Sequence, residues 1–121
     1  MGGAVKRAHK YHARATEYDG IRFDSKAEAN RYKELQLLEK AGEIGYLKVH
    51  PTFELQPPFV DRTGKKQRAI IYEADFSYVD GATEQVVIED IKGVETEAFK
   101  LKKKLFLYHH PELELRIVKC H

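Results

Sequence analysis

Apolar positions along the chain follow a helical spacing in two segments. Residues 25–42 place apolar side chains three or four positions apart, with Ser25 suited to the N-cap and Gly42 past the end. A second helical pattern covers residues 97–109 and stops before Pro111, because proline cannot continue a helix. The spacing therefore predicts two α-helices, separated by more than fifty residues of a different pattern.

The remaining segments follow the alternating pattern of β-strands. Residues 15–23 predict a short hairpin that turns at Asp19-Gly20, the strongest local hairpin signal. Further strands are predicted at residues 44–49, 52–56, 68–79, 85–92 and 113–119. The order is hairpin, helix, three or four strands, helix and strand, which favours an α/β fold with a mixed sheet and helices packed against it. With 121 residues the chain forms one domain, residues 15–121, after a basic N-terminal arm, residues 1–14.

Charged residues interrupt two of the predicted strands. Asp75 lies in the middle of the apolar strand 68–79, and Asp90 and Lys92 end the strand 85–92. Because side chains alternate between the faces of a strand, Asp90 and Lys92 share one face and Glu89 points the other way. If the two strands are neighbours, both aspartates converge at one end of the sheet. Two close carboxylates repel each other unless a cation lies between them, and a hard divalent ion is the usual solution.

Glu28 is a third acid that could reach this point. It lies in the first predicted helix, on the side that leans toward the sheet. The segment Ser25 to Glu28 also fits a capping box, in which the glutamate bonds back to the N-cap amide. The two roles do not exclude each other.

Basic residues gather in three segments, although the net charge is only +2. The N-terminal arm, the loop at 61–68 and the second predicted helix each have an excess of lysine and arginine. If folding brings them to one face, they form a phosphate-binding surface; separately, each is an ordinary solvated surface. The candidates for DNA binding are Lys6, Arg7, Lys10, Arg14, Lys65, Lys66, Lys100, Lys102, Lys103 and Lys104.

These residues together resemble a known family. A helix glutamate (Glu28), a strand aspartate (Asp75) and the acid-x-lysine Asp90-Ile91-Lys92 are similar to the PD-(D/E)xK nuclease superfamily, and small phage and prophage members are the nearest in pattern. The resemblance covers residues 16–119 and implies a restriction-endonuclease-like α-β-β-β-α-β core. Ala74 replaces the proline of the motif's name.

The resemblance implies hydrolysis of DNA phosphodiesters with Mg²⁺ or Mn²⁺. Asp75, Asp90 and the carbonyl of Ile91 would hold the ion, and Lys92 would orient the attacking water. Glu28 would bond to waters on the ion or bind a second one. The resemblance to Holliday junction resolvases further implies a homodimer acting on branched or nicked DNA, because two opposed cuts need two sites.

Two other functional classes fit the same residues. A non-catalytic DNA-binding module would explain the basic segments, and a structural or adaptor protein would use the acids as ion-pair partners of Lys92. A monomeric enzyme would instead be a nonspecific or nicking endonuclease. No apolar run approaches the length of about 18 residues that spans a membrane, and one lone cysteine, Cys120, predicts an intracellular setting. The resemblance to phage and prophage proteins implies that this setting is the cytoplasm of a bacterial host.

Overall fold

A computed structural model describes residues 15–120 of the chain. Its centre is a mixed four-stranded sheet in the order β10-β9-β8-β3. Strand β8 is antiparallel to both β3 and β9, and β10 is parallel to β9. The strands are β3 (Ile44–Val49), β8 (Phe76–Asp80), β9 (Val86–Lys92) and β10 (Glu114–Lys119). The predicted mixed α/β fold is confirmed.

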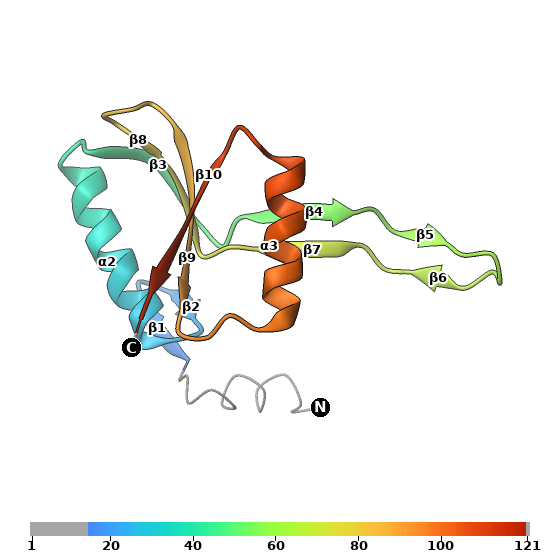
Figure 1. Cartoon of the computed structure of the whole chain (residues 1–121). Coiled ribbons are helices and arrows are strands. Elements are labelled where there is room, and N and C mark those ends of the chain that lie inside the picture. The colour runs from blue at the N-terminus through green and yellow to red at the C-terminus, as the bar shows by residue number, and fades with distance from the viewer. Residues whose placement is uncertain (1–14, 121) are drawn as a thin grey trace.

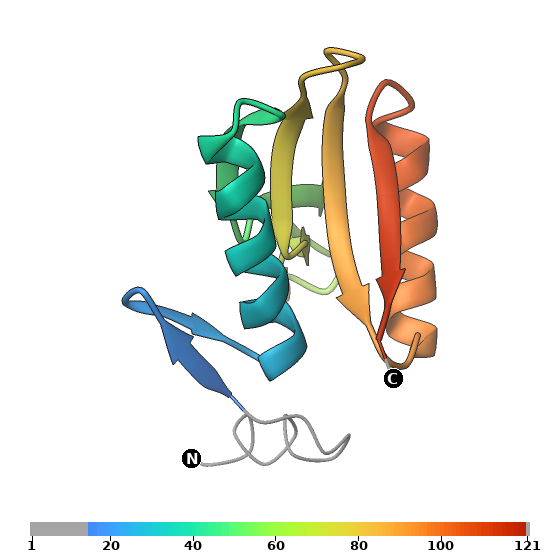
Figure 2. The ribbon, with the colours of Figure 1, turned by 90° about the vertical axis from the view of Figure 1, so that its left-hand side faces the viewer.

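One helix covers each face of this sheet (Figure 1). Helix α2 (Lys26–Lys40) begins at the N-cap Ser25, and helix α3 (Glu97–His109) begins at the N-cap Thr96. Figure 2 looks onto the sheet from the α2 side, with α3 behind it. None of the helices in the described residues is long and apolar enough to cross a membrane.

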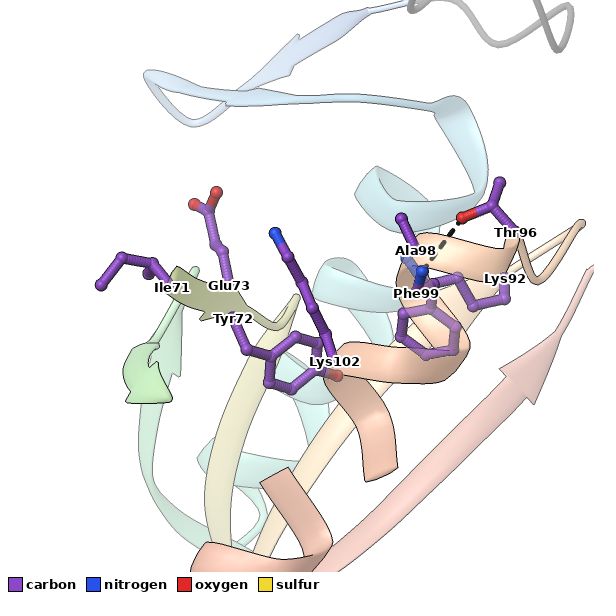
Figure 3. A pocket seen from close by; sticks show the side chains of 8 residues that line it. All are labelled: Ile71, Tyr72, Glu73, Lys92, Thr96, Ala98, Phe99 and Lys102. Carbon is purple, nitrogen blue, oxygen red and sulfur yellow. Dashed lines mark hydrogen bonds between the residues drawn. The ribbon is translucent and has the colours of Figure 1, made fainter. Parts of the chain in front are cut away.

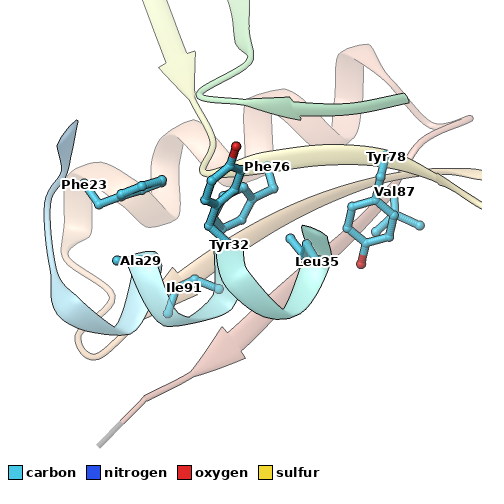
Figure 4. Close-up of a cluster of buried hydrophobic side chains, with 8 residues drawn as sticks. All are labelled: Phe23, Ala29, Tyr32, Leu35, Phe76, Tyr78, Val87 and Ile91. Carbon is cyan, nitrogen blue, oxygen red and sulfur yellow. The ribbon is translucent and has the colours of Figure 1, made fainter. Parts of the chain in front are cut away.

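The hairpin β1 (Thr16–Tyr18) and β2 (Ile21–Phe23) precedes α2, as predicted. Its turn residues, Asp19 and Gly20, have φ angles of 57° and 76°, which the hairpin turn requires and which glycine and aspartate tolerate. Phe23 then packs into the core between α2 and the sheet, together with Tyr32, Phe76 and Ile91 (Figure 4). The hairpin therefore fixes the start of α2, where Glu28 lies.

The segment predicted as one strand, residues 68–79, is divided by a bend. Strand β7 (Ile70–Glu73) leaves the sheet and pairs with β4 (Thr52–Gln56), while β8 pairs with β3 and β9. Tyr72 and Ala74 consequently belong to the core on the α3 side, and Phe76 and Tyr78 to the core on the α2 side. Simple alternation along a single strand would place these four residues on one face, but the bend reverses the alternation and divides them between the two faces.

A two-stranded ribbon extends from the body beyond α3 (Figure 1). It is formed by the pair β4 and β7 and continues through a second pair, β5 (Phe59–Val60) and β6 (Lys66–Gln67). A turn at residues 61–65 closes its tip, where Asp61 accepts bonds from the amides of Thr63 and Lys65. The alternating pattern predicted no strand at β5 or β6.

Candidate functional site

Asp75 lies at the bend between β7 and β8 and is almost fully buried. Its amide donates to the carbonyl of Glu89 at 3.1 Å, and its own carbonyl accepts from the amide of His50 at 2.9 Å. Its side-chain Oδ2 accepts from the amide of Ile91 at 2.7 Å. The strands around Asp75 thus hold both its backbone and its carboxylate beside β9, as predicted from the sequence.

Asp90 and Lys92 lie on the α3 face of β9, as strand alternation predicts. Nζ of Lys92 is 3.7 Å from Oδ1 of Asp90 and 4.3 Å from the centre of the Phe99 ring. The hydroxyl of Tyr72 donates to the other oxygen of Asp90. The ammonium of Lys92 therefore lies between the carboxylate of Asp90 and the Phe99 ring of α3, in a cation–π contact with the ring.

Glu89 occupies the opposite face and has a different set of contacts. Its side chain is fully buried, and its two oxygens accept from Nε and the terminal nitrogen of Arg31 at 2.6 and 2.9 Å. The hydroxyl of Tyr78 donates to it at 2.6 Å. Glu89 thus joins α2 to the sheet, and only Asp90 shares a face with Lys92.

Glu28 lies on the first turn of α2 and points inward. Its amide donates to Oγ of Ser25 at 3.2 Å, which is one half of the predicted capping box. Its carboxylate is buried, and Oε1 has no hydrogen-bond partner among residues 15–120. A buried acceptor without a donor is costly, so Oε1 is the feature of this site that most needs a ligand.

His50 completes the site, although the sequence analysis did not single it out as a candidate. Its Nε2 lies 4.0 Å from Oε1 of Glu28, and its ring packs against Phe23. Ligand atoms of Glu28, His50 and Asp75 all lie within 4.8 Å of one another. The backbone of His50 has φ 57°, an uncommon value for this residue, and no sequence pattern signals it.

The three acids hold their protons unusually strongly. Burial, followed by the charge of Asp24, raises the pKa of Glu28 to about 7. Burial and the charge of Glu28 raise the pKa of Asp75 to about 7, and burial and Asp75 do the same for the pKa of Asp90. Such shifts show that nearby positive charges and hydrogen-bond donors do not offset the cost of burying the three carboxylates in their charged form. A bound cation would offset that cost.

The predicted DNA-binding residues divide among several environments. Lys65 and Lys66 are exposed at the ribbon tip, on the same side of the sheet as α3. Lys6, Arg7, Lys10 and Arg14, in the N-terminal arm, lie outside the described residues.

The lysines of α3 do not form one uniform outer face. Lys104 is exposed, and Lys100 pairs with Glu97 at 3.3 Å. Lys103 is half-buried and pairs with Glu95 at 3.1 Å, so it does not share the exposed face of Lys100 and Lys104. Lys102 lines a pocket beside Lys92 (Figure 3).

Comparison with known families assigns the chain to one of them. Residues 8–121 match the family described as "Protein of unknown function (DUF1064)". The chain is a member of the DUF1064 family. No curated protein and no solved structure matches it. The description of DUF1064 assigns no activity to the family.

Proposed function

We propose that this protein is a metal-dependent endonuclease that hydrolyses phosphodiester bonds in DNA. The observation that carries the proposal is the convergence of three buried acids beside one lysine, with Oε1 of Glu28 unpartnered. An acid cluster that was only structural would be neutralised by its own hydrogen bonds. Here Asp90 has Tyr72 and Lys92, whereas Glu28 has no donor for Oε1 among the described residues.

The donor set suits a hard divalent cation such as Mg²⁺ or Mn²⁺. Glu28 and Asp75 offer carboxylate oxygens within 4.8 Å of one another, and His50 offers an imidazole nitrogen, which Mn²⁺ accepts more readily than Mg²⁺. Asp90 lies outside this group of three, and its role as a ligand stays a prediction. Ile91 contacts Asp75 through its amide, and the role of its carbonyl as a ligand stays a prediction. When bound, the ion would polarise the scissile phosphate and lower the pKa of a water.

The protein's own groups would position the substrate and compensate charge. The ammonium of Lys92, fixed between Asp90 and the ring of Phe99, would orient the attacking water and offset charge that develops on the phosphate. The Tyr72 hydroxyl would hold Asp90 in one orientation. Burial of the acids excludes bulk water and strengthens these interactions.

The substrate in this proposal is branched or nicked DNA, in the cytoplasm of a bacterial host, and the active form is a homodimer. Basic residues on the ribbon tip and α3 would bind phosphates.

Exposed Leu101 and Leu107 on α3, and Phe59 and Val60 on the ribbon, are apolar groups available to a second copy. Sedimentation at micromolar concentration, with and without a four-way junction, tests the dimer; a 14.0 kDa species in both cases contradicts it.

Cleavage of plasmid, duplex, flap, nicked and four-way substrates with Mg²⁺ or Mn²⁺ tests the activity. Cutting that requires metal and Asp75 supports the nuclease. DNA binding without cutting in either metal would instead favour a non-catalytic DNA-binding module. Calorimetric titration with Mn²⁺ distinguishes the nuclease from a structural or adaptor protein, because acids whose charge is balanced by Lys92 alone should bind no metal.

A further inference from the structure

A pocket of about 400 Å³ opens beside Lys92, between strand β7 and helix α3 (Figure 3). Its volume lies within the range of roughly 300–1,000 Å³ that small-ligand sites occupy. Tyr72 and Phe99 contribute buried rings, and Thr96, Ala98 and Lys102 line the α3 side. The pocket therefore adjoins the proposed catalytic lysine and is separate from the cluster of Glu28, His50 and Asp75.

Lys102 is the charged group on the helical wall of this pocket. Lys100 and Lys103 are paired with Glu97 and Glu95, but no carboxylate in the described part of the chain lies within ion-pair distance of Lys102. Figure 3 shows its side chain running from α3 into the space between Ala98 and Glu73. A half-buried, unpaired ammonium of this kind is suited to an anion.

The opposite wall has different chemistry. Ile71 of β7 is 40 % exposed and offers an apolar surface, and the neighbouring Glu73 offers an exposed hydrogen-bond acceptor. A ligand that fits these walls carries an anionic group for Lys102, an apolar body for Ile71 and a hydrogen-bond donor for Glu73. A nucleotide has all three. A base stacked within a duplex cannot enter such a pocket, because it must first leave its stack.

We propose that the pocket between β7 and α3 binds one unpaired nucleotide next to the scissile phosphate, with Lys102 on its phosphate. This inference rests on the proposed nuclease function and specifies its substrate class as DNA with an unpaired nucleotide at a branch or nick. The ribbon supplies one wall of the pocket, which gives β7 a role in choosing the substrate.

Binding in EDTA tests the inference without any cleavage. Fluorescence anisotropy compares a nicked duplex with the same duplex bearing a one-nucleotide flap, using the full chain. We expect the wild type to bind the flap substrate more tightly, and Lys102→Ala to weaken flap binding by about tenfold, as loss of a charged hydrogen bond implies. Lys40→Ala, which removes the same charge from the exposed end of α2, should change both substrates little and equally.

A second variant tests the inference independently, in case Lys102→Ala does not fold. Ala98→Trp fills the pocket and retains every lysine, so it should abolish the preference for the flap while the melting temperature stays near that of the wild type. Equal affinity of the wild-type protein for both substrates would overturn the inference, as would equal weakening of both by Lys102→Ala.

Competition identifies the source of the nucleotide. Millimolar thymidine monophosphate or inorganic phosphate should displace the flap substrate poorly, because the rest of the DNA contributes most of the affinity. Displacement at micromolar concentration would assign the pocket to a free nucleotide and overturn the proposal. Flap preference without cleavage in either Mg²⁺ or Mn²⁺ would retain the pocket and refute the nuclease. Cleavage without flap preference would refute the pocket and retain the nuclease.

Discussion

Oδ2 of Asp75 accepts a hydrogen bond of 2.7 Å from the backbone amide of Ile91. This bond ties the bend between β7 and β8 to the residue that follows Asp90, so the spacing of the two aspartates is set by the backbone. A site held in this way is organised before any ligand binds. It also keeps two acids close together, where the charge of Asp75 raises the pKa of Asp90.

Asp75→Asn and Asp90→Asn should each abolish cleavage without unfolding the protein. Either change removes a negative charge from a buried cluster, and the side-chain amide oxygen introduced by Asp75→Asn can still accept from the amide of Ile91. In EDTA, each variant should melt at or above the wild-type temperature by calorimetry. Glu54→Gln, a change at an exposed acid on β4, is the control for the loss of one charge. A loss of several degrees in either aspartate variant would show that the acids are structural.

Glu89→Gln should affect stability far more than chemistry. Because Arg31 would lose its bidentate partner and is itself partly exposed, we expect the free energy of unfolding to fall by about 2 kcal/mol. Urea denaturation measures this change, and cleavage per folded molecule should stay close to that of the wild type. Total loss of cleavage in a folded variant would place Glu89 in the site instead.

Stability in EDTA should fall as the pH rises from 5 to 8. The folded-state pKa values of Glu28, Asp75 and Asp90, about 7, lie above the ordinary values of 4.5 and 3.8. The folded state therefore binds more protons than the unfolded state between about pH 4 and 7, and the stability contributed by these groups is lost as pH rises through that range. Melting temperatures measure the effect. Mn²⁺ should reduce it, and Asp75→Asn should weaken it; a flat profile in the wild type would contradict the burial of charged acids.

His50→Ala should weaken binding of Mn²⁺ by roughly tenfold and of Mg²⁺ by less, because imidazole nitrogen favours the transition metal. Calorimetric titration at pH 7.5 measures both affinities. His109→Ala, an exposed histidine at the end of α3, is the matched control. Equal affinities for Mn²⁺ in the wild type and the His50 variant would remove His50 from the ligand set.

DNA binding should weaken steeply with salt, in proportion to the number of phosphate contacts. Each contact contributes a slope of roughly 0.9 in log K against log salt. Deleting residues 1–13, or replacing Lys65 and Lys66 with alanine, should flatten that slope and leave Mn²⁺ binding unchanged. An unaltered slope after the deletion would make the N-terminal arm irrelevant to DNA; an unaltered slope after the double replacement would do so for the ribbon tip.

Local patterns in the sequence determined most of the elements. Both helices, the first hairpin and strands β3, β4 and β9 lie where they were predicted, because caps, turn residues and hydrophobic periods act over a few residues. The alternation along β9 also separated Asp90 from Glu89 correctly. Charge in an apolar strand was a strong enough signal to mark Asp75, Asp90 and Lys92 without any structure.

Tertiary contacts decided the rest. The bend at Asp75 depends on the amide of Ala74 donating to the carbonyl of Pro51 and that of Asp75 to Glu89, which are partners far away in the sequence. The same bend brings His50 beside Glu28 and turns Tyr72 toward Asp90. No local period encodes these contacts, because they arise only when separate segments are packed against one another. The sequence by itself thus determined which acids and which lysine are candidates, and the packing of β7, β8 and α2 decided which neighbours complete their site.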